Sequence, residues 1–329
     1  MVATTTISKP ALKTSTQTPP TRTIPFAFVP RIHVNMVASV VQRFIPQAVQ
    51  SIAALPPCTA IGVGLTAFQT FSCFVNFQSQ IEATTPYSKF SSGGDGEAYI
   101  SGKSAMFTIY APAFLYLATS AFPAAIEMGS GNGRLTIITS MLLFHFAKRL
   151  LETGFLHKYT KKVNKFTSSF IGVYYALVCA LIFNFSKTVS TGFQPATLPI
   201  GLGIFTIGQI GNLFHHWLLA SLRSSTTPTP PKRSYGLSGG NIKSKSKSKS
   251  NGYEIPQGGL FKYVATPHYL FEVISWLGLA IVSSQLNVYL VALSMAMYLG
   301  GRSVSTTKWY RENLPNYPKD RKSMVPFIF

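Results

Sequence analysis

Runs of about 20 apolar residues recur along this chain of 329 residues and constrain its fold more than any other feature. A helix of that length spans the hydrocarbon core of a bilayer and satisfies its own backbone hydrogen bonds there. The runs lie at 58–78, 104–125, 134–151, 168–186, 198–220, 265–283 and 286–301. The last two are short and separated by a few residues near Gln285, so they also suit a re-entrant pair. We predict an all-α, polytopic membrane protein with about seven transmembrane helices.

Composition agrees with a membrane protein, because 47% of the residues are hydrophobic, only 12% are charged and the mean hydropathy is +0.24. The net charge of +20 is unevenly placed. Basic residues concentrate in 152–167, in 221–264 and in the C-terminal tail, whereas the alternate loops 126–133 and 187–197 carry almost none. This asymmetry predicts a cytosolic C-terminus and argues against nucleic acid as the partner.

The segments outside the apolar runs define the predicted domain organisation. Residues 1–50 contain no acidic residue and form either a disordered extension or a targeting segment for a plastid or mitochondrion. Residues 51–223 carry the N-terminal transmembrane helices. Residues 224–252 are rich in Ser, Gly, Pro and Lys and form a low-complexity cytosolic loop, which precedes a C-terminal domain over 253–329.

The cysteines and the spaced glycines are predicted to serve packing. Cys58, Cys73 and Cys179 all lie in apolar runs without the spacing of a metal or redox motif. The stretch GLGIFTIGQIG, residues 201–211, has spaced glycines, but it lies inside an apolar run with no strand before it. Close packing between helices therefore explains it better than a dinucleotide-binding turn.

Ionisable residues within the apolar runs are costly to bury and are candidates for function. Glu272 is a clear case, since its flanks are apolar on every side and a buried carboxylate needs partners. Three clusters stand out: His145, Lys148, Arg149 and Glu152; Asn212, His216 and Arg223; and His268, Tyr269, Glu272 and Trp276 with Arg302, Lys308 and Tyr310. Lys148, Arg149 and Arg223 also stand where snorkelling anchors are common.

The three clusters converge on one cytosol-facing interior and predict a phosphorylated, ring-bearing cofactor, because cations and aromatic rings recognise such a ligand. His215 and His216 raise the alternative of a metal site. No carboxylate or further histidine stands at a recurrent ligand spacing from them, and we predict no metal.

Three C-terminal blocks carry a resemblance to a known family. They are YEIPQGGLFKYVATPHYLFEVISWLG, GGRSVSTTKWY and NYPKDRKSMVPFIF, in this order within 253–329. These blocks resemble the C-terminal domain of the steroid 5α-reductases and of their relatives, the trans-2-enoyl-CoA reductases and polyprenol reductases. The resemblance implies a seven-helix membrane enzyme that uses NADPH to reduce a carbon–carbon double bond conjugated to a carbonyl.

The resemblance also implies site residues. The cofactor-binding positions are Arg149, Asn212, Arg223, His268, Glu272, Arg302 and Tyr310. His268 stands where an Asn is usual in the family. Lys148, Glu152 and Tyr269 match functional positions of the enoyl-CoA reductases, and Tyr269 is the expected proton donor or enolate partner.

Two departures from the steroid reductases leave the exact reaction open. Phe146 stands in place of a tyrosine that contacts the substrate carbonyl, and Ile109 in place of a glutamate. The alternatives are therefore a steroid or cyclic-enone reductase, a very-long-chain enoyl-CoA reductase, and a catalytically silent member that binds lipid or nucleotide. The expected location is the endoplasmic reticulum membrane, with a plastid membrane as the alternative, and the oligomeric state stays open.

Overall fold

A computed structural model describes residues 60–86, 90, 96, 98–128, 133–159, 161–188, 197–225 and 254–329. The predicted extension 1–50, Cys58 and nearly all of the predicted loop 224–252 lie outside these residues. The described part is mostly helical, as predicted, and it contains one two-stranded sheet.

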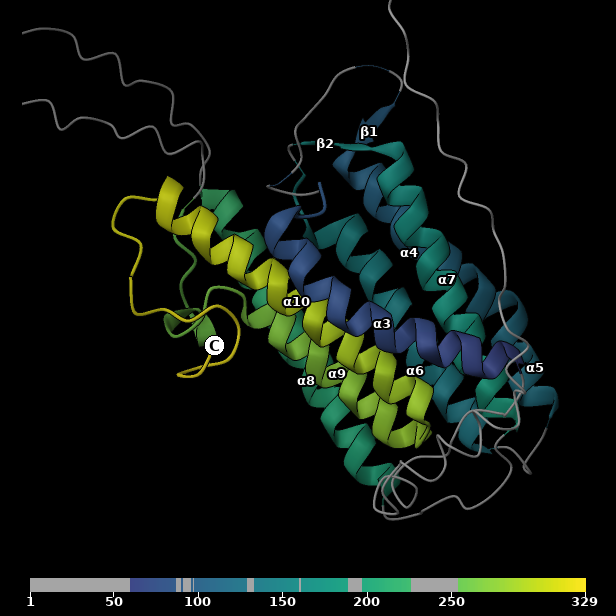
Figure 1. Ribbon diagram of the computed structural model, residues 1–329. Coiled ribbons are helices and arrows are strands. Elements are labelled where there is room, and N and C mark those ends of the chain that lie inside the picture. The colour runs from purple at the N-terminus through teal and green to yellow at the C-terminus, as the bar shows by residue number, and fades with distance from the viewer. Residues whose placement is uncertain are drawn as a thin grey trace, which may run out of the picture.

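Each of the seven apolar runs coincides with a helix (Figure 1). The helices are α3 (Ala60–Glu82), α4 (Gly102–Tyr116) continued by η2 (Leu117–Ala121) and α5 (Phe122–Glu127), α6 (Gly133–Leu151), α7 (Lys165–Thr188), α8 (Thr197–Ser225), α9 (Pro267–Ser283) and α10 (Leu286–Asn313). Three of the corresponding stretches are long and apolar enough to cross a membrane, namely Gly102–Glu127, Lys165–Lys187 and Thr197–Leu222. The count of seven spans therefore stays a prediction.

The last two apolar runs form two separate helices that follow each other closely, α9 with 17 residues and α10 with 28. Ser284 ends α9 in the left-handed conformation with φ 48°, and Gln285 leads directly into α10. α10 continues to Asn313, well beyond the predicted end at residue 301. The extension is polar, which is why hydropathy did not include it.

Small residues bring α8 and α9 together. A Cβ atom on Gly208 would lie 2.4 Å from Ser275 Oγ, and one on Gly278 would lie 2.4 Å from the Phe205 backbone nitrogen. Gly201, Gly208 and Gly211 of GLGIFTIGQIG thus serve helix packing, as predicted, whereas a Cβ on Gly203 would meet nothing within 4 Å. α4 packs mainly on α7, and α3 runs beside α10 on the outside of the bundle (Figure 1).

The bundle has an apolar part and a polar part. The apolar core gathers fully buried side chains from several helices, including Leu135, Ile138, Leu142 and Cys179. Polar side chains gather instead where α6 ends and continues as the π-helical turn η4 (Glu152–Leu156). There β1 (Tyr99–Ser101) pairs antiparallel with β2 (Lys162–Asn164) and ties the start of α4 to the segment that follows η4.

Candidate active site

A cavity of about 230 Å³ lies at the polar part of the bundle. Helices α4, α6, α7, α8, α9 and α10 contribute to its wall, together with the segment 157–163. The lining residues are Gly102, Met106, Tyr110, Arg149, His157, Lys158, Tyr159, Lys161, Val163, Tyr175, Asn212, His216, Leu219, Ala220, His268, Tyr269, Glu272, Met295, Tyr298 and Leu299. The lining is aromatic and basic, with Glu272 as its acidic member.

A buried network of charges supports one side of this cavity. Glu152 is 3% exposed, and its Oε1 accepts a hydrogen bond from Lys148 Nζ at 3.0 Å, while its Oε2 accepts one from Arg149 Nη1 at 2.5 Å. His216 Nδ1 lies 3.1 Å from the same Oε2. A carboxylate with two cations on its two oxygens has the partners that burial of charge requires.

The network joins α6 to α8 and α9 through Asn212. Lys148 Nζ donates to Asn212 Oδ1 at 2.6 Å, and Asn212 Nδ2 donates to the His268 carbonyl at 2.9 Å. Glu152 is the first residue of the π-helical turn, and such turns often occur at functional sites because they rotate side chains away from the regular helical face.

Among the described residues, Glu272 has two aromatic side chains as its direct partners and no lysine or arginine. Its Oε1 accepts a hydrogen bond from Trp276 Nε1 at 3.2 Å and lies 3.3 Å from His145 Nε2. Gln209 Nε2 lies 2.9 Å from His145 Nδ1. In this orientation of the Gln209 amide its nitrogen donates to His145 Nδ1, and His145 Nε2 faces Glu272.

Two tyrosines of the cavity are each paired with an arginine. Arg302 Nε donates to the Tyr269 hydroxyl oxygen at 3.2 Å, and Arg302 Nη1 donates to the Thr85 carbonyl at 3.1 Å. Arg149 Nη2 donates to the Tyr110 hydroxyl oxygen at 2.5 Å. Since arginine has only donors, each phenol oxygen is the acceptor of its bond.

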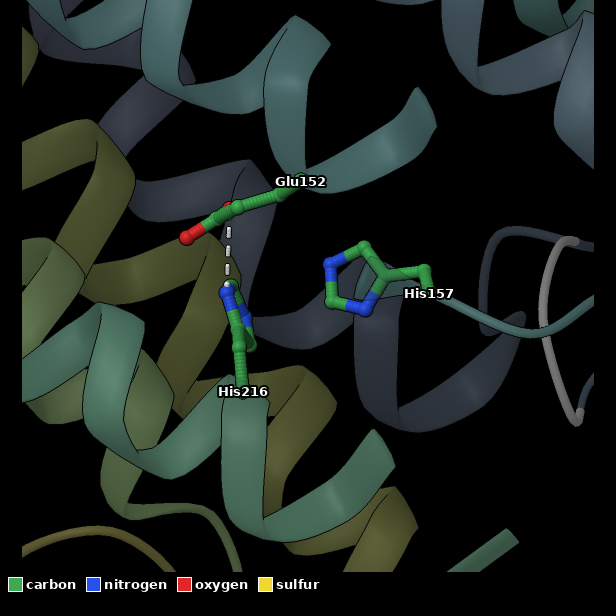
Figure 2. A group of neighbouring side chains, drawn as sticks. All are labelled: Glu152, His157 and His216. Carbon is green, nitrogen blue, oxygen red and sulfur yellow. Dashed lines mark hydrogen bonds and ion pairs between the residues drawn. The ribbon is translucent and has the colours of Figure 1, made fainter. Parts of the chain in front are cut away.

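Glu152, His157 and His216 form a group whose potential metal-ligating atoms lie within 4.8 Å of one another (Figure 2). Glu152 and His157 are five positions apart, but His216 follows 59 positions after His157, so spacing gave no sign of this group. The rings of His157 and His216 meet edge to face at 4.8 Å. Both oxygens of Glu152 are already bonded to Lys148 and Arg149, and a dication would have to bind beside these two cations. The local charge therefore favours an anion over a metal.

The structure brings most of the predicted site residues together. Arg149, Asn212, His268, Tyr269 and Glu272 line the cavity, and Arg302, which is 1% exposed, contacts Tyr269 from behind. Lys148 and Glu152 lie in the buried network beside the lining.

Other predicted or compared positions lie elsewhere. Tyr310 stacks on Tyr317 in a small cluster with Ala265 and Leu314, outside the lining of this cavity. The side chain of Arg223 lies outside those described. Phe146 and Ile109 are buried, at 0% and 3% exposure, and Phe146 belongs to the apolar core.

Sequence analysis missed several residues of the lining, in particular Tyr110, His157, Tyr159, Tyr175 and Tyr298. Tyr110 directly follows Ile109, the position where the resemblance led us to expect a glutamate. Inspection of that block could therefore have identified Tyr110 as a candidate. No comparable signal marks the others. The Tyr159 hydroxyl is buried without a hydrogen-bond partner among the described residues, and burial raises the pKa of Tyr159 to about 12.

Comparison with known proteins identifies related sequences over most of the chain. The family described as 3-oxo-5-alpha-steroid 4-dehydrogenase matches residues 237–329. The 3-oxo-5-alpha-steroid 4-dehydrogenase 1 of Mus musculus is 26% identical over 81% of this chain and 95% of its own length. The steroid 5-alpha-reductase DET2 of Solanum lycopersicum is 28% identical over 75% of this chain and 88% of its own length. A very-long-chain enoyl-CoA reductase of Dictyostelium discoideum is 27% identical over 56% of this chain and 55% of its own length.

Proposed function

We propose that this chain, which is similar to steroid 5-alpha-reductases and to enoyl-CoA reductases, is a membrane-bound, NADPH-dependent reductase of a carbon–carbon double bond conjugated to a carbonyl in a lipid. The observation that carries this proposal is the cavity in which Tyr269, Glu272 and Arg149 meet. As a location we propose the endoplasmic reticulum, with the basic loops in the cytosol.

The residues of the cavity fit NADPH by their chemistry. Arg149, Lys158 and Lys161 offer three cations to the phosphates, and the histidine and tyrosine rings offer surfaces for a base or a nicotinamide. Asn212 and Glu272 add polar groups to the cavity. Asn212 is held by the His268 carbonyl, and Glu272 is held by His145 and Trp276. We assign these residues to the cofactor, together with His268 and Arg302. Arg223 and Tyr310 stay predictions from the resemblance.

When bound, NADPH supplies a hydride for the β-carbon of the conjugated system. The electrons of the double bond then move toward the carbonyl oxygen, which becomes an enolate. Tyr269 is suited to donate a hydrogen bond to that oxygen, because Arg302 occupies the acceptor side of its hydroxyl and stabilises negative charge beside it. Lys148 and Glu152 act through Arg149 and Asn212, whose positions they fix.

Isotope transfer tests the reaction directly. Purified protein in detergent would receive NADPH deuterated at the transferred position, together with a cyclic enone lipid or a long-chain enoyl-CoA. We expect one deuterium at the β-carbon of the saturated product, detected by mass spectrometry. NADPH should be preferred over NADH, because arginines favour the additional 2′-phosphate. Failure to reduce either substrate class, with NADPH still bound, would support a catalytically silent member instead.

The two substrate classes have different support. The most extensive relatives reported above, from mouse and tomato, are steroid reductases by name. The KRLLE stretch and Tyr269 resemble the enoyl-CoA reductases, and Phe146 argues against a strict steroid site. The steroid or cyclic enone stays the leading proposal and the enoyl thioester the second, and the isotope experiment separates them by which product gains deuterium.

A further inference from the structure

The two departures at Ile109 and Phe146 remove a carboxyl group and a phenol from the region of the site. The structure offers no hydroxyl at either position, and Phe146 packs edge to face on Tyr175 with ring centroids 5.5 Å apart. Tyr175 itself lines the cavity, so Phe146 lies behind the lining. The carbonyl oxygen of a substrate must therefore find its donors on other side chains.

Tyr110 is a phenol that reaches the same cavity from α4. Arg149 Nη2 donates to its oxygen at 2.5 Å, and the guanidinium carbon lies 4.8 Å from the centre of its ring. The hydroxyl hydrogen of Tyr110 is thus directed to a position other than Arg149. A cation on a phenol oxygen also favours negative charge there, which makes the phenol a stronger hydrogen-bond donor.

The arginine that contacts Tyr110 is itself fixed in place. Arg149 Nη1 donates to Glu152 Oε2 at 2.5 Å and lies 3.2 Å from His216 Nδ1. His216 on α8 and Glu152 on the π-helical turn therefore fix the Arg149 side chain while it contacts Tyr110 on α4. Donors that are fixed before the reaction stabilise developing charge without a cost of reorganisation.

Two further phenols of the cavity, those of Tyr159 and Tyr298, are less suited to this role. Burial raises the pKa of Tyr159 to about 12, which makes its hydroxyl a weaker donor to an anion. The Tyr298 hydroxyl donates to Thr85 Oγ1 at 3.2 Å. Among the described contacts, Tyr110 and Tyr269 are the cavity phenols whose oxygen accepts from an arginine.

We propose that Tyr110, oriented by Arg149, is a second hydrogen-bond donor to the carbonyl oxygen of the substrate and replaces the groups absent at positions 109 and 146. This role rests on the function proposed above. Tyr110 keeps its proton throughout. The hydride forms the bond to the β-carbon, the electron pair of the double bond moves to the carbonyl oxygen, and the α-carbon takes its proton from water.

Binding of enolate mimics tests this role without turnover. Substituted phenols and naphthols of increasing acidity imitate the enolate oxygen, and their affinity for the NADP⁺-loaded protein can be measured by calorimetry. We expect Tyr110→Phe to weaken the most acidic phenols about tenfold, the value of one hydrogen bond to a charged group. The control is Tyr116→Phe, the same change on the same helix at a residue packed against the apolar core. Equal affinities in the wild type and Tyr110→Phe would overturn the proposal.

A second variant changes the donor in the opposite direction. Incorporation of 3-fluorotyrosine at position 110 keeps the ring and makes the phenol more acidic, so acidic phenols should bind more tightly than to the wild type. Unchanged or weaker binding contradicts the proposed donor role. This variant decides the question if Tyr110→Phe does not fold.

Turnover separates this inference from the proposed function. If the wild type reduces an enone or enoyl substrate, Tyr110→Phe should lower kcat at least tenfold with an unchanged Kd for NADPH. Full turnover in Tyr110→Phe would overturn the donor role and leave the reductase function standing. If no substrate is reduced but phenol binding still depends on Tyr110, the reductase function fails and the anion-binding role of Tyr110 stands.

Discussion

At the scale of single residues, the buried polar groups of this chain come in mutually satisfied sets. Glu272 has His145 and Trp276, Tyr269 has Arg302, and Glu152 has both Lys148 and Arg149. Each of these groups would be costly to bury alone. These sets lie at or beside one cavity. We therefore expect the substitution of one member to change either cofactor binding or turnover.

Replacement of Tyr269 by phenylalanine removes one hydroxyl and leaves the packing nearly unchanged. We expect Tyr269→Phe to fold, to bind NADPH and to turn over at least tenfold more slowly, because a lost donor to an oxyanion costs on the order of 100- to 1,000-fold. Steady-state kinetics on the substrate identified by isotope transfer provide the measurement. Full activity would reduce Tyr269 to a packing residue and leave Tyr110 as the donor.

Replacement of Arg302 by alanine removes a buried cation that contacts Tyr269 and the Thr85 carbonyl. We expect Arg302→Ala to abolish the retention of NADPH during purification. Because the same change removes this donor from two partly buried acceptors, the melting temperature must be measured as well. Arg302→Lys serves as the control, since it keeps the charge without the planar guanidinium. Retention of NADPH in a folded Arg302→Ala protein would make Arg302 a structural residue only.

At the scale of secondary-structure elements, the close approach of α8 and α9 positions both halves of the site. α8 carries Asn212 and His216, and α9 carries Tyr269 and Glu272. The hydrogen bond from Asn212 to the His268 carbonyl crosses between them at 2.9 Å. A separation of the helices by a methyl group would therefore disturb the cavity as well as the packing.

A pair of glycine-to-alanine substitutions tests this packing. In Gly278→Ala the new Cβ would lie 2.4 Å from the Phe205 nitrogen, and we expect a loss of about 1–3 kcal/mol in the free energy of unfolding. Gly203→Ala is the matched control, because a Cβ there meets nothing within 4 Å. That variant should be as stable as the wild type, or more stable by up to about 1 kcal/mol. Thermal unfolding in detergent provides the comparison, and equal stability of both variants would contradict the close packing of α8 and α9.

At the scale of the whole molecule, apolar core and polar cavity occupy different parts of one helical bundle. The basic segment 157–165 follows η4 and contributes to the cavity wall, so the cavity lies at the part of the bundle that the charge asymmetry assigns to the cytosol. A water-soluble cofactor would enter from that side.

Protease accessibility tests this orientation. In sealed microsomes, an externally added lysine-specific protease should cut the chain near Lys243–Lys249, because this basic linker is predicted to be cytosolic and disordered. Fragments are identified by mass spectrometry, with a lumenal marker protein as the control for intact vesicles. Protection of the linker until detergent is added would reverse the predicted topology.

The sequence by itself predicted the seven apolar helices and, through the C-terminal blocks, the resemblance to a family. Hydropathy succeeds here because the length of an apolar run and the properties of a helix are local. It also indicated that Glu272 is buried. The family match over residues 237–329 confirms the resemblance to the reductases. Most of the site residues that the resemblance implied line one cavity or lie beside it, and their roles stay predictions.

Only the tertiary structure decided which polar groups meet. The sequence indicated that Glu272 needs partners without showing which, and within the described residues the side chains in direct contact with it are His145 and Trp276. Tyr110 and Arg149 are 39 positions apart in the chain, and nothing in the spacing predicts their contact. Such pairs depend on how each helix is rotated about its axis and how closely it packs on its neighbours. These are properties of the whole bundle, set by small residues such as Gly208 and Gly278 and by the π-helical turn at Glu152.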